Sequence, residues 1–370
     1  MKAKYLASMA IVGAALCGPA QAQSSVTLYG LLSAGIGYAT NQSGKQTWQA
    51  LSGTNQNPRW GMKGIEPLGG GTSAIFALEA GFNVMTGSGA QNGRAFGRQS
   101  WVGLSNKRYG TLTLGRQYDA IHDYLGPIII ASNGVNIGDN DNGYNDLRLQ
   151  NSVKYLSPEY RGLRATAVYG FSNSTGFADN RAMSFGLGYR NGAFKWNAVY
   201  AQYDHPYSSS NQDGALGNDY ASSLLLFSRS GVDGKSYASK QRVAGTGGFY
   251  TVGNALIGAL FTDVRYHYLD GSHLRLQNAD INVNYHVTPA LVLGAAYTYT
   301  FGKYDVIDTH PRWHQVNLQA DYFLSKRTDV ALTVIGQQAS GDAEHAQIFG
   351  FSQSTSIRQA IVTLGVRHVF

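Results

Sequence analysis

The last ten residues constrain the fold of this chain more than any other segment. In Ile361–Phe370 apolar and polar residues alternate, and the segment ends on an aromatic side chain. The alternating residues are Val362, Leu364 and Val366 against Thr363, Gly365 and Arg367. Successive side chains of a strand point to opposite faces, so this segment predicts a strand with one apolar and one polar face. In an exported protein such a strand is typical of the closing strand of an outer-membrane β-barrel, and a soluble β-sandwich is the alternative.

The N-terminal residues predict export. Lys2 and Lys4 form a basic segment, Tyr5–Leu16 is apolar, and Ala20–Ala22 has the small-x-small pattern of a cleavage site. The apolar segment is too short to cross a bilayer as a helix. We therefore expect residues 1–22 to be a cleaved signal peptide.

Residues 23–370 are expected to form one barrel domain without disulfides. The one cysteine, Cys17, belongs to the leader, and Leu16 before it argues against lipidation. Charged residues make up 14% of the chain, against roughly 25% in typical soluble domains. After the leader, no apolar run approaches the ~18 residues of a spanning helix. Strands with alternate lipid-facing and water-facing residues account for both properties.

The charge balance does not indicate a nucleic-acid partner. Without Lys2 and Lys4 the chain keeps 27 of its 29 Lys and Arg residues against 22 Asp and Glu, a net charge of +5. Nucleic-acid binding requires clustered basic residues. Here the basic residues stand singly at alternate positions of the expected strands.

Period-two alternation divides residues 23–370 into hairpins. The expected strands are Val26–Tyr38, Arg59–Glu66, Thr72–Asn83, Phe96–Ser105, Thr111–Tyr118, Arg148–Leu156, Leu163–Phe171, Arg181–Tyr189, Phe194–Tyr203, Gln241–Val252, Leu256–Tyr268, Leu276–Val287, Leu291–Phe301, Arg312–Leu324, Val330–Ala339 and Ile357–Phe370. Tight turns alternate strictly with long loops, the first of which runs through Asn57. The pattern predicts an all-β protein, a 16-stranded antiparallel transmembrane β-barrel with short periplasmic turns and long extracellular loops. Glycines weaken Gln241–Val252, so fourteen or eighteen strands are the alternative.

Six groups of residues, in order along the chain, carry a family pattern. They are Ser25–Gly30, Arg59–Gly64 with Leu68–Gly71, Arg98–Leu104, Thr111–Gln117, Asn151–Tyr155 with Ser157 and Pro158, and Gly365–Phe370. In these segments the chain resembles the Gram-negative general porins, specifically the β-proteobacterial trimeric branch. The resemblance implies a homotrimer in the lipid of the cell outer membrane, with one water-filled pore per subunit and an inward-folded third loop. It also implies that Phe370 is a C-terminal assembly signal for the barrel-assembly machinery.

The long connection after the fifth expected strand is the candidate constriction. Residues 119–147 carry five acids, which are Asp119, Asp123, Asp139, Asp141 and Asp146. A loop of this length usually has a function or is disordered. We expect it to fold inward and to bring Asp119 or Asp123 to the narrow zone. The alternative is that these acids are simply solvated outside the barrel.

Basic residues are expected on the inner wall opposite that loop. Alternation with outward apolar residues assigns Arg59, Lys63, Arg98, Arg148 and Lys154 to the lumen, and the family carries wall arginines at the positions of Arg59, Arg98 and Arg148. The inward direction of Arg98 rests on an outward Trp101, and Glu79 is expected to face water in the lumen. Charged side chains around a pore tune ion selectivity, and surplus positive charge favours anions. A lumenal salt bridge without effect on permeation is the alternative for each arginine.

Arg116 differs from the wall group because it shares a face with Leu112 and Leu114. An outward arginine in lipid is costly, so we expect it at the trimer interface, paired with a neighbour's carboxylate, or near the membrane rim. Leu31 and Ser33 depart from the family, in which some relatives carry an inward Lys and Asp. These departures leave the strength and sign of selectivity open.

Together these features predict a passive diffusion channel for small hydrophilic solutes and ions, with weak anion selectivity. A solute-specific outer-membrane channel is one alternative, and a surface adhesin or receptor that uses the loop Asp204–Lys240 is another. The sequence has no CxxC, HExxH, GxSxG or P-loop motif, and its nine histidines are scattered. We therefore expect no enzyme activity, no cofactor and no metal site.

Overall fold

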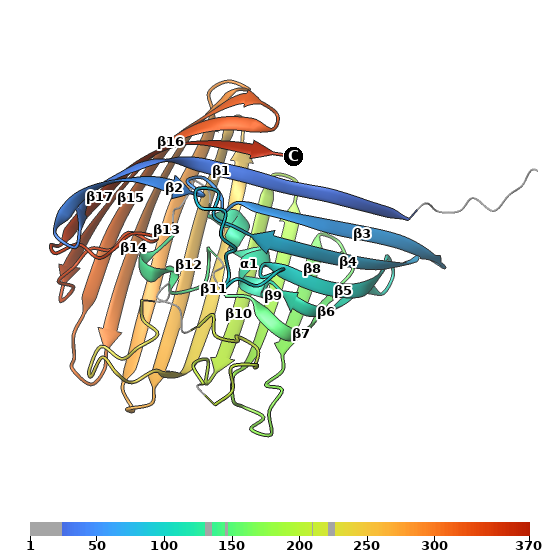
Figure 1. Ribbon diagram of the computed structural model, residues 1–370, viewed down its shortest axis with the longest axis horizontal. Helices are drawn as coiled ribbons and strands as arrows, with labels where there is room; N and C mark the ends of the chain where they lie inside the picture. The colour runs from blue at the N-terminus through green and yellow to red at the C-terminus, as the bar shows by residue number, and fades with distance from the viewer. Residues whose placement is uncertain (1–23, 130–134, 145–146, 209, 221–225) are drawn as a thin grey trace, which may run out of the picture.

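One antiparallel sheet closes on itself to form a barrel (Figure 1). The computed structural model describes residues 24–129, 135–144, 147–208, 210–220 and 226–370. The expected signal peptide and Asp146 lie outside these ranges. Within them, none of the helices combines the length and hydropathy that a membrane-spanning helix requires.

The strands follow the alternation of the sequence closely. They are β1 Ser25–Gln42, β2 Lys45–Ser52, β3 Arg59–Gly69, β4 Thr72–Gly81, β5 Gln99–Asn106, β6 Gly110–Gln117, β7 Leu149–Leu156, β8 Leu163–Gly170, β9 Arg181–Asn191, β10 Phe194–Asp204, β11 Ala238–Val252, β12 Ala255–Tyr268, β13 His273–His286, β14 Leu291–Tyr304, β15 Pro311–Ser325, β16 Thr328–Gly341 and β17 Arg358–Val369. The helical segments are α1 Ala120–Tyr124, η1 Gly126–Ile128 and η2 Ile137–Asp139.

The strand β2 lies where the sequence suggested only a loop. Ser43 and Gly44 both have positive φ, 51° and 89°, which is the geometry of a two-residue hairpin turn. The N-terminal part of β1 pairs with β3 and its C-terminal part pairs with β2. Because β2 and β3 pair with successive parts of β1, they occupy a single strand position of the ring. The barrel therefore has sixteen strand positions, as predicted.

The first and last strands close the ring. β1 pairs with β17 from Leu31 opposite Val369 to Ala39 opposite Ile361. Beyond this ladder, the backbone of Phe370 exchanges two hydrogen bonds with that of Gly30, at N–O distances of 3.1 and 3.0 Å. The seam is therefore closed from Gly30 to Ala39, and such closure is the condition for a sheet that spans a bilayer.

The two rims of the barrel differ in the length of their connections. Short turns join β3 to β4, β5 to β6 and the later hairpins at the end that also holds both chain termini, and we name this end the turn rim. The opposite end, the loop rim, carries the long connections 82–98, 118–148, 205–237 and 342–357. The strict alternation expected from the sequence is wrong in detail. On the loop rim, two residues join β1 to β2 and four join β12 to β13.

The two faces of the wall differ as the alternation predicts. Along β12, Ile257 and Phe261 are exposed on the outer face, whereas Leu260 and Val264 are buried on the inner face. The inner residues are covered because the connection 118–148, which we name the inner loop, folds into the barrel and packs against them. The inward-folded third loop is thus confirmed, and it follows the fifth strand position of the ring.

Candidate pore constriction

The inner loop begins with a short helix whose first turn is capped by Asp119. The Asp119 carboxylate accepts hydrogen bonds from the backbone N–H of His122 at 3.0 Å, from the Asn142 amide at 3.1 Å and from the Tyr203 hydroxyl at 2.7 Å. Its side chain is completely buried, and this burial raises its pKa above the ordinary value. Asp119 therefore fastens the loop to itself and to β10, and it does not line the open part of the lumen as the sequence suggested.

Helix α1 lies against the inner face of β8, β9 and β10. The Tyr124 ring rests on Gly186 and Gly188, where a Cβ atom would approach the ring to 2.4 and 2.8 Å. The Tyr124 hydroxyl is 3.0 Å from Thr166 Oγ1. Any larger side chain on this part of β9 would push the helix towards the pore axis, so the two glycines define how far the loop stands from the wall.

Beyond α1, the described residues of the inner loop contact a row of inward amide side chains. Asn282 donates to the Ile128 carbonyl at 3.0 Å, and Gln315 donates to the Val135 carbonyl at 2.9 Å. On the neighbouring strand β12 the Thr262 hydroxyl donates to Asp141 at 2.7 Å. The amide-lined inner face therefore serves as the docking track of the loop from β12 to β15.

A buried ion pair holds the wall opposite the inner loop. Arg98 Nε donates to Glu79 Oε1 at 2.7 Å, and its Nη2 donates to the Tyr118 hydroxyl at 2.8 Å. Glu79 also accepts from the hydroxyls of Tyr118 and Tyr29, both at 3.1 Å. Glu79 and Arg98 are each 4% exposed. Glu79 thus points inward, but it is enclosed by its partners and does not face water as expected.

The inward position of Arg98 was anticipated for a reason that the structure contradicts. Trp101 pairs with Ala77 and lies on the same face as Glu79, which is the lumen face. Arg98 itself precedes β5, and its backbone N–H donates to the Glu79 carbonyl. The residue turns inward because the chain enters the strand there, and strand alternation does not determine its direction.

Arg59 and Lys63 lie on the lumen face of β3. Arg59 pairs with Leu31 and Gly81, and Lys63 pairs with Thr27 and Ala77, all on the face of Glu79. Lys63 is exposed, with its ammonium 5.5 Å from the centre of the Tyr29 ring. Arg59 is half-buried. Of the five predicted basic residues, these two present their charge most directly to the lumen.

Arg148 and Lys154 contact the start of the inner loop. Arg148 is 3% exposed and its guanidinium lies 5.5 Å from the centre of the Tyr118 ring. Lys154 donates to the Tyr118 carbonyl at 3.1 Å and forms an ion pair with Asp123 at 2.5 Å. The structure therefore brings Arg98, Arg148 and Lys154 to one place around Tyr118.

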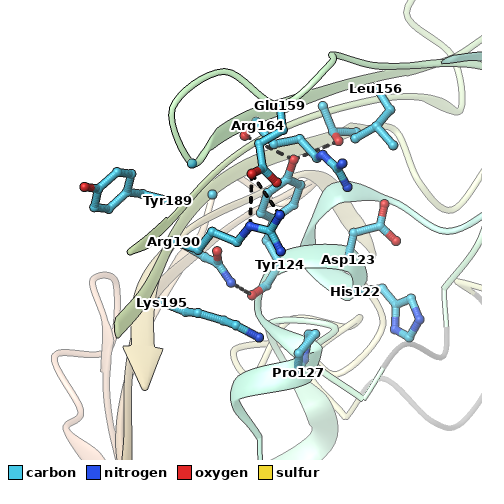
Figure 2. Close-up of a pocket in the computed structure, with 14 residues that line it drawn as sticks. His122, Asp123, Tyr124, Pro127, Leu156, Glu159, Arg164, Tyr189, Arg190 and Lys195 are labelled. Atoms are coloured by element: carbon cyan, nitrogen blue, oxygen red, sulfur yellow. Dashed lines mark hydrogen bonds and ion pairs between the residues drawn. The ribbon is translucent and has the colours of Figure 1, made fainter. Parts of the chain in front are cut away.

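Asp123 and His122 face a cavity of about 690 Å³ between the inner loop and the turn rim (Figure 2). Across this cavity Arg190 and Glu159 form a second, more exposed ion pair at 2.9 Å. Burial lowers the pKa of His122 to about 3, and the cations Arg148, Lys154, Arg98 and Arg59 act in the same direction. Burial and neighbouring cations thus both favour a neutral His122 imidazole.

A segment between β2 and β3 also enters the lumen, although it was expected only as part of the first long loop. In residues 53–58, the Asn55 amide donates to Asp329 at 3.1 Å, and the Ser33 hydroxyl lies 3.4 Å from that of Thr54. On the inner loop, the Tyr144 hydroxyl is 3.5 Å from Asn57 Oδ1. The narrow zone is thus bounded by two inward segments, and the one visible signal was Gly53 and Pro58 flanking a polar stretch.

Arg116 finds its carboxylate within the same chain. Its Nη2 lies 2.5 Å from Asp219 in the connection 205–237, and its Nε donates to the Gly97 carbonyl at 2.7 Å. Asp219 also pairs with Arg94 at 2.7 Å. The expected neighbour's carboxylate is therefore replaced by internal contacts that join the end of β6 to two connections of the loop rim, 82–98 and 205–237.

The site offers pairs of opposite charge. Among the residues that the structure describes, no group of three or more His, Cys, Asp or Glu side chains could hold a metal ion. The arrangement can orient permeating ions and dipoles between the wall and the inner loop.

Comparisons with known proteins agree with this geometry. A family model described as Gram-negative porin matches residues 7–342. An outer membrane porin protein of Bordetella pertussis is 38% identical over 57% of this chain and 61% of its own length. Outer membrane porin protein 32 of Delftia acidovorans is 26% identical over 99% of both chains.

Solved structures show the same fold. The anion-selective porin from Comamonas acidovorans aligns with a TM-score of 0.75 and 22% identity, covering 94% of this chain and all of that one. A trimer form of OmpT from Vibrio cholerae aligns with a TM-score of 0.69 and 15% identity, covering 94% and 99%. With a closed barrel, an inward loop and a family model that spans most of its residues, this chain is an outer-membrane protein and belongs to the Gram-negative porin family.

Proposed function

We propose that this protein is a passive diffusion channel for small hydrophilic solutes and ions, with a modest preference for anions. The observation that carries the proposal is the charge balance beside the inner loop. Five basic side chains, Arg59, Lys63, Arg98, Arg148 and Lys154, stand near the carboxylates Glu79 and Asp123. The other described acids of the inner loop, Asp119, Asp139 and Asp141, are buried. Fixed positive charge on a narrow wall attracts anions and repels cations. The anion selectivity named for the Comamonas porin supports the same sign.

We further infer that the channel assembles as a homotrimer. Strands β5 to β8 have 8 residues each, whereas β12 to β14 have 14. A spanning strand needs about 9–11 residues when tilted. Strands β5 to β8 are shorter than this, so we expect a neighbouring subunit, and not lipid, to cover this part of the wall. The trimer form of OmpT supports this arrangement. Removal of residues 1–22 and recognition of Phe370 by the assembly machinery remain predictions.

Conductance in planar bilayers under a salt gradient tests the proposed selectivity. The informative variant is Arg59→Gln/Lys63→Gln, and Lys326→Gln/Arg327→Gln in an exposed turn is the control with the same charge change. A unit charge about 7 Å from an ion contributes about 0.6 kcal/mol in water. Screening at 0.1 M salt about halves this value.

These magnitudes predict a clear result. Each charge removed should lower the anion-to-cation permeability ratio about threefold, or about eightfold for both. The zero-current potential should therefore shift towards cations in the pore variant and stay constant in the control. An unchanged potential in Arg59→Gln/Lys63→Gln would contradict the role of the wall charges. Conductance that saturates at millimolar salt would instead indicate a solute-specific site.

A further inference from the structure

A second cavity lies on the lumen side of the wall at the loop rim. It measures about 400 Å³, which is within the usual range for small-molecule sites. Leu51 of β2 and Thr363 of β17 line it, and their partners on β1, Gly35 and Gly37, lie on the lumen face. The other walls come from the inner loop at Tyr144, the segment 53–58 and the connections 82–98 and 342–357. We name it the loop-rim cavity.

The loop-rim cavity has no ionised side chain in its described lining. Its lining residues include no Lys, Arg, His, Asp or Glu. The cavity of Figure 2, in contrast, is lined by Asp123, Glu159, Arg164, Arg190 and Lys195. An ion that entered the loop-rim cavity would lose water without gaining a counter-charge, which is unfavourable. The lining therefore suits a neutral solute.

Four aromatic rings form much of the apolar lining, and they are Phe82, Tyr144, Phe349 and Phe351. The Phe349 and Tyr144 rings meet edge to face with their centres 5.3 Å apart. The turn that carries Phe349 is fixed by Ile348, which is 1% exposed and donates its backbone N–H to Gln359 Oε1 at 2.7 Å. The rings are therefore held in place before any solute arrives.

Three amide side chains form much of the polar lining. Gln91 Oε1 is buried and has no hydrogen-bond partner among the described residues. Asn83 Oδ1 accepts from the backbone N–H groups of its own turn at 2.9 and 3.2 Å, and Asn57 Oδ1 lies 3.5 Å from the Tyr144 hydroxyl. An amide offers two donors as well as an acceptor. These contacts leave the NH₂ groups of Asn57 and Asn83 for another partner.

We propose that the loop-rim cavity binds the ring of a neutral sugar in the pyranose form. The apolar faces of such a ring fit against aromatic side chains, and its hydroxyl groups donate and accept hydrogen bonds as amides do. A neutral aromatic solute would cover the rings but leave the amides without partners, which costs free energy. The inference goes beyond the proposed passive channel, because it adds a binding step and concerns a solute without charge.

Block of single-channel current by maltose, which consists of two pyranose rings, tests this site in the full mature protein. The cavity shares Asn57 and Tyr144 with the narrow zone, so a bound sugar obstructs the pore. Maltose added on the loop-rim side of a planar bilayer should lower the current saturably, with half-block in the millimolar range. The open-chain polyol mannitol, at the same mass concentration, should lower the current only through viscosity.

The salt dependence of the block separates this site from the wall charges. Because the described lining carries no charge, the half-blocking concentration of maltose should be equal at about 0.1 M and about 1 M salt. A solute held by the cations of the wall would instead be released as the salt concentration rises.

Two variants test the rings and the amides separately. Phe349→Leu removes an aromatic face, Gln91→Met removes the amide with the unpaired oxygen, and Tyr160→Leu is the control at a ring that is 68% exposed on the turn rim. Each test variant should raise the half-blocking concentration about fivefold, because each loses one contact of ordinary strength. The double variant should raise it about 25-fold, and the control should be blocked like the unmodified protein.

The zero-current potential should stay constant in all these variants, since none of them changes charge. Gln91→Met keeps the test valid if Phe349→Leu fails to fold, because the amide oxygen that it removes has no described partner. Three results would overturn the proposal. They are equal block by maltose and mannitol, a half-blocking concentration that rises with salt, and equal block of folded Gln91→Met and the unmodified protein.

Discussion

Replacement of Glu79 by Gln should strongly destabilise the barrel. Glu79 and Arg98 have side chains that are each 5% exposed, and their nitrogen and oxygen atoms are 2.7 Å apart. Removing one member of such a pair leaves a buried charge without compensation, which costs about 3–5 kcal/mol. The free energy of unfolding, measured by guanidinium titration of the barrel in detergent micelles, should fall by about this amount.

A matched control exists within the same barrel. The pair of Glu159 and Arg190 has a similar distance of 2.9 Å, but its side chains are 27% and 62% exposed. Exposed pairs contribute about 0–1 kcal/mol, so Glu159→Gln should change the unfolding free energy little. In the double variant Glu79→Gln/Arg98→Met the charge that was left behind is removed as well, so part of the lost stability should return.

The same variant should also alter permeation. Glu79→Gln removes negative charge from a wall that already carries Arg59 and Lys63, so the zero-current potential should shift further towards anions. Two results would refute the reasoning. One is an unfolding free energy equal to that of Glu159→Gln, and the other is a double variant less stable than Glu79→Gln alone.

Three further expectations concern the inner loop, its histidine and the seam. Gly186→Val should displace Tyr124, destabilise the barrel by about 1–3 kcal/mol and lower single-channel conductance. The double variant Gly186→Val/Tyr124→Ala should recover conductance. Equal conductance in the unmodified protein and both variants would contradict the packing argument. His122, with its pKa lowered to about 3, should stay neutral from pH 7.5 to 5, so ion selectivity should not change through this residue in that range. A change of selectivity with a midpoint near pH 6.5 that disappears in His122→Gln would contradict the burial argument. Because its folded-state pKa lies below the unfolded value, its contribution to stability falls as the pH falls from about 6.5 towards 3. Deletion of Phe370 removes two hydrogen bonds between β1 and the C-terminus and should lower the folding yield in lipid vesicles. Phe370→Ala keeps these backbone hydrogen bonds and should fold normally there. Equal folding yields of the deletion and of Phe370→Ala would disprove the contribution of the seam.

The strands could be predicted because the two solvents of a barrel wall impose a period of two. Along β12 the exposed Ile257 and Phe261 alternate with the buried Leu260 and Val264, as period-two alternation requires. The prediction failed where another factor decides the geometry. Lys45–Ser52 was assigned to a loop because its composition is polar, while the Ser43–Gly44 turn makes it a strand.

Site residues were harder to predict because alternation gives a face but not the partners. Asp119 was expected in the pore on the basis of its charge, and the structure uses that charge as a helix cap. Arg116 required an acid more than a hundred residues away in the chain, which no local pattern reveals. The segment 53–58 could not be recognised from sequence, since its inward path depends on contacts with Asp329 on a distant strand.

The joining of the first strand to the last has a consequence for how the molecule is made. Until β17 has been made, β1 has no partner on one side, so β1–β16 alone cannot complete the ring. Contacts between residues so far apart are slow to form because a long loop must close first. Closure of the ring is therefore a late step in folding, and one side of β1 stays unpaired until it happens.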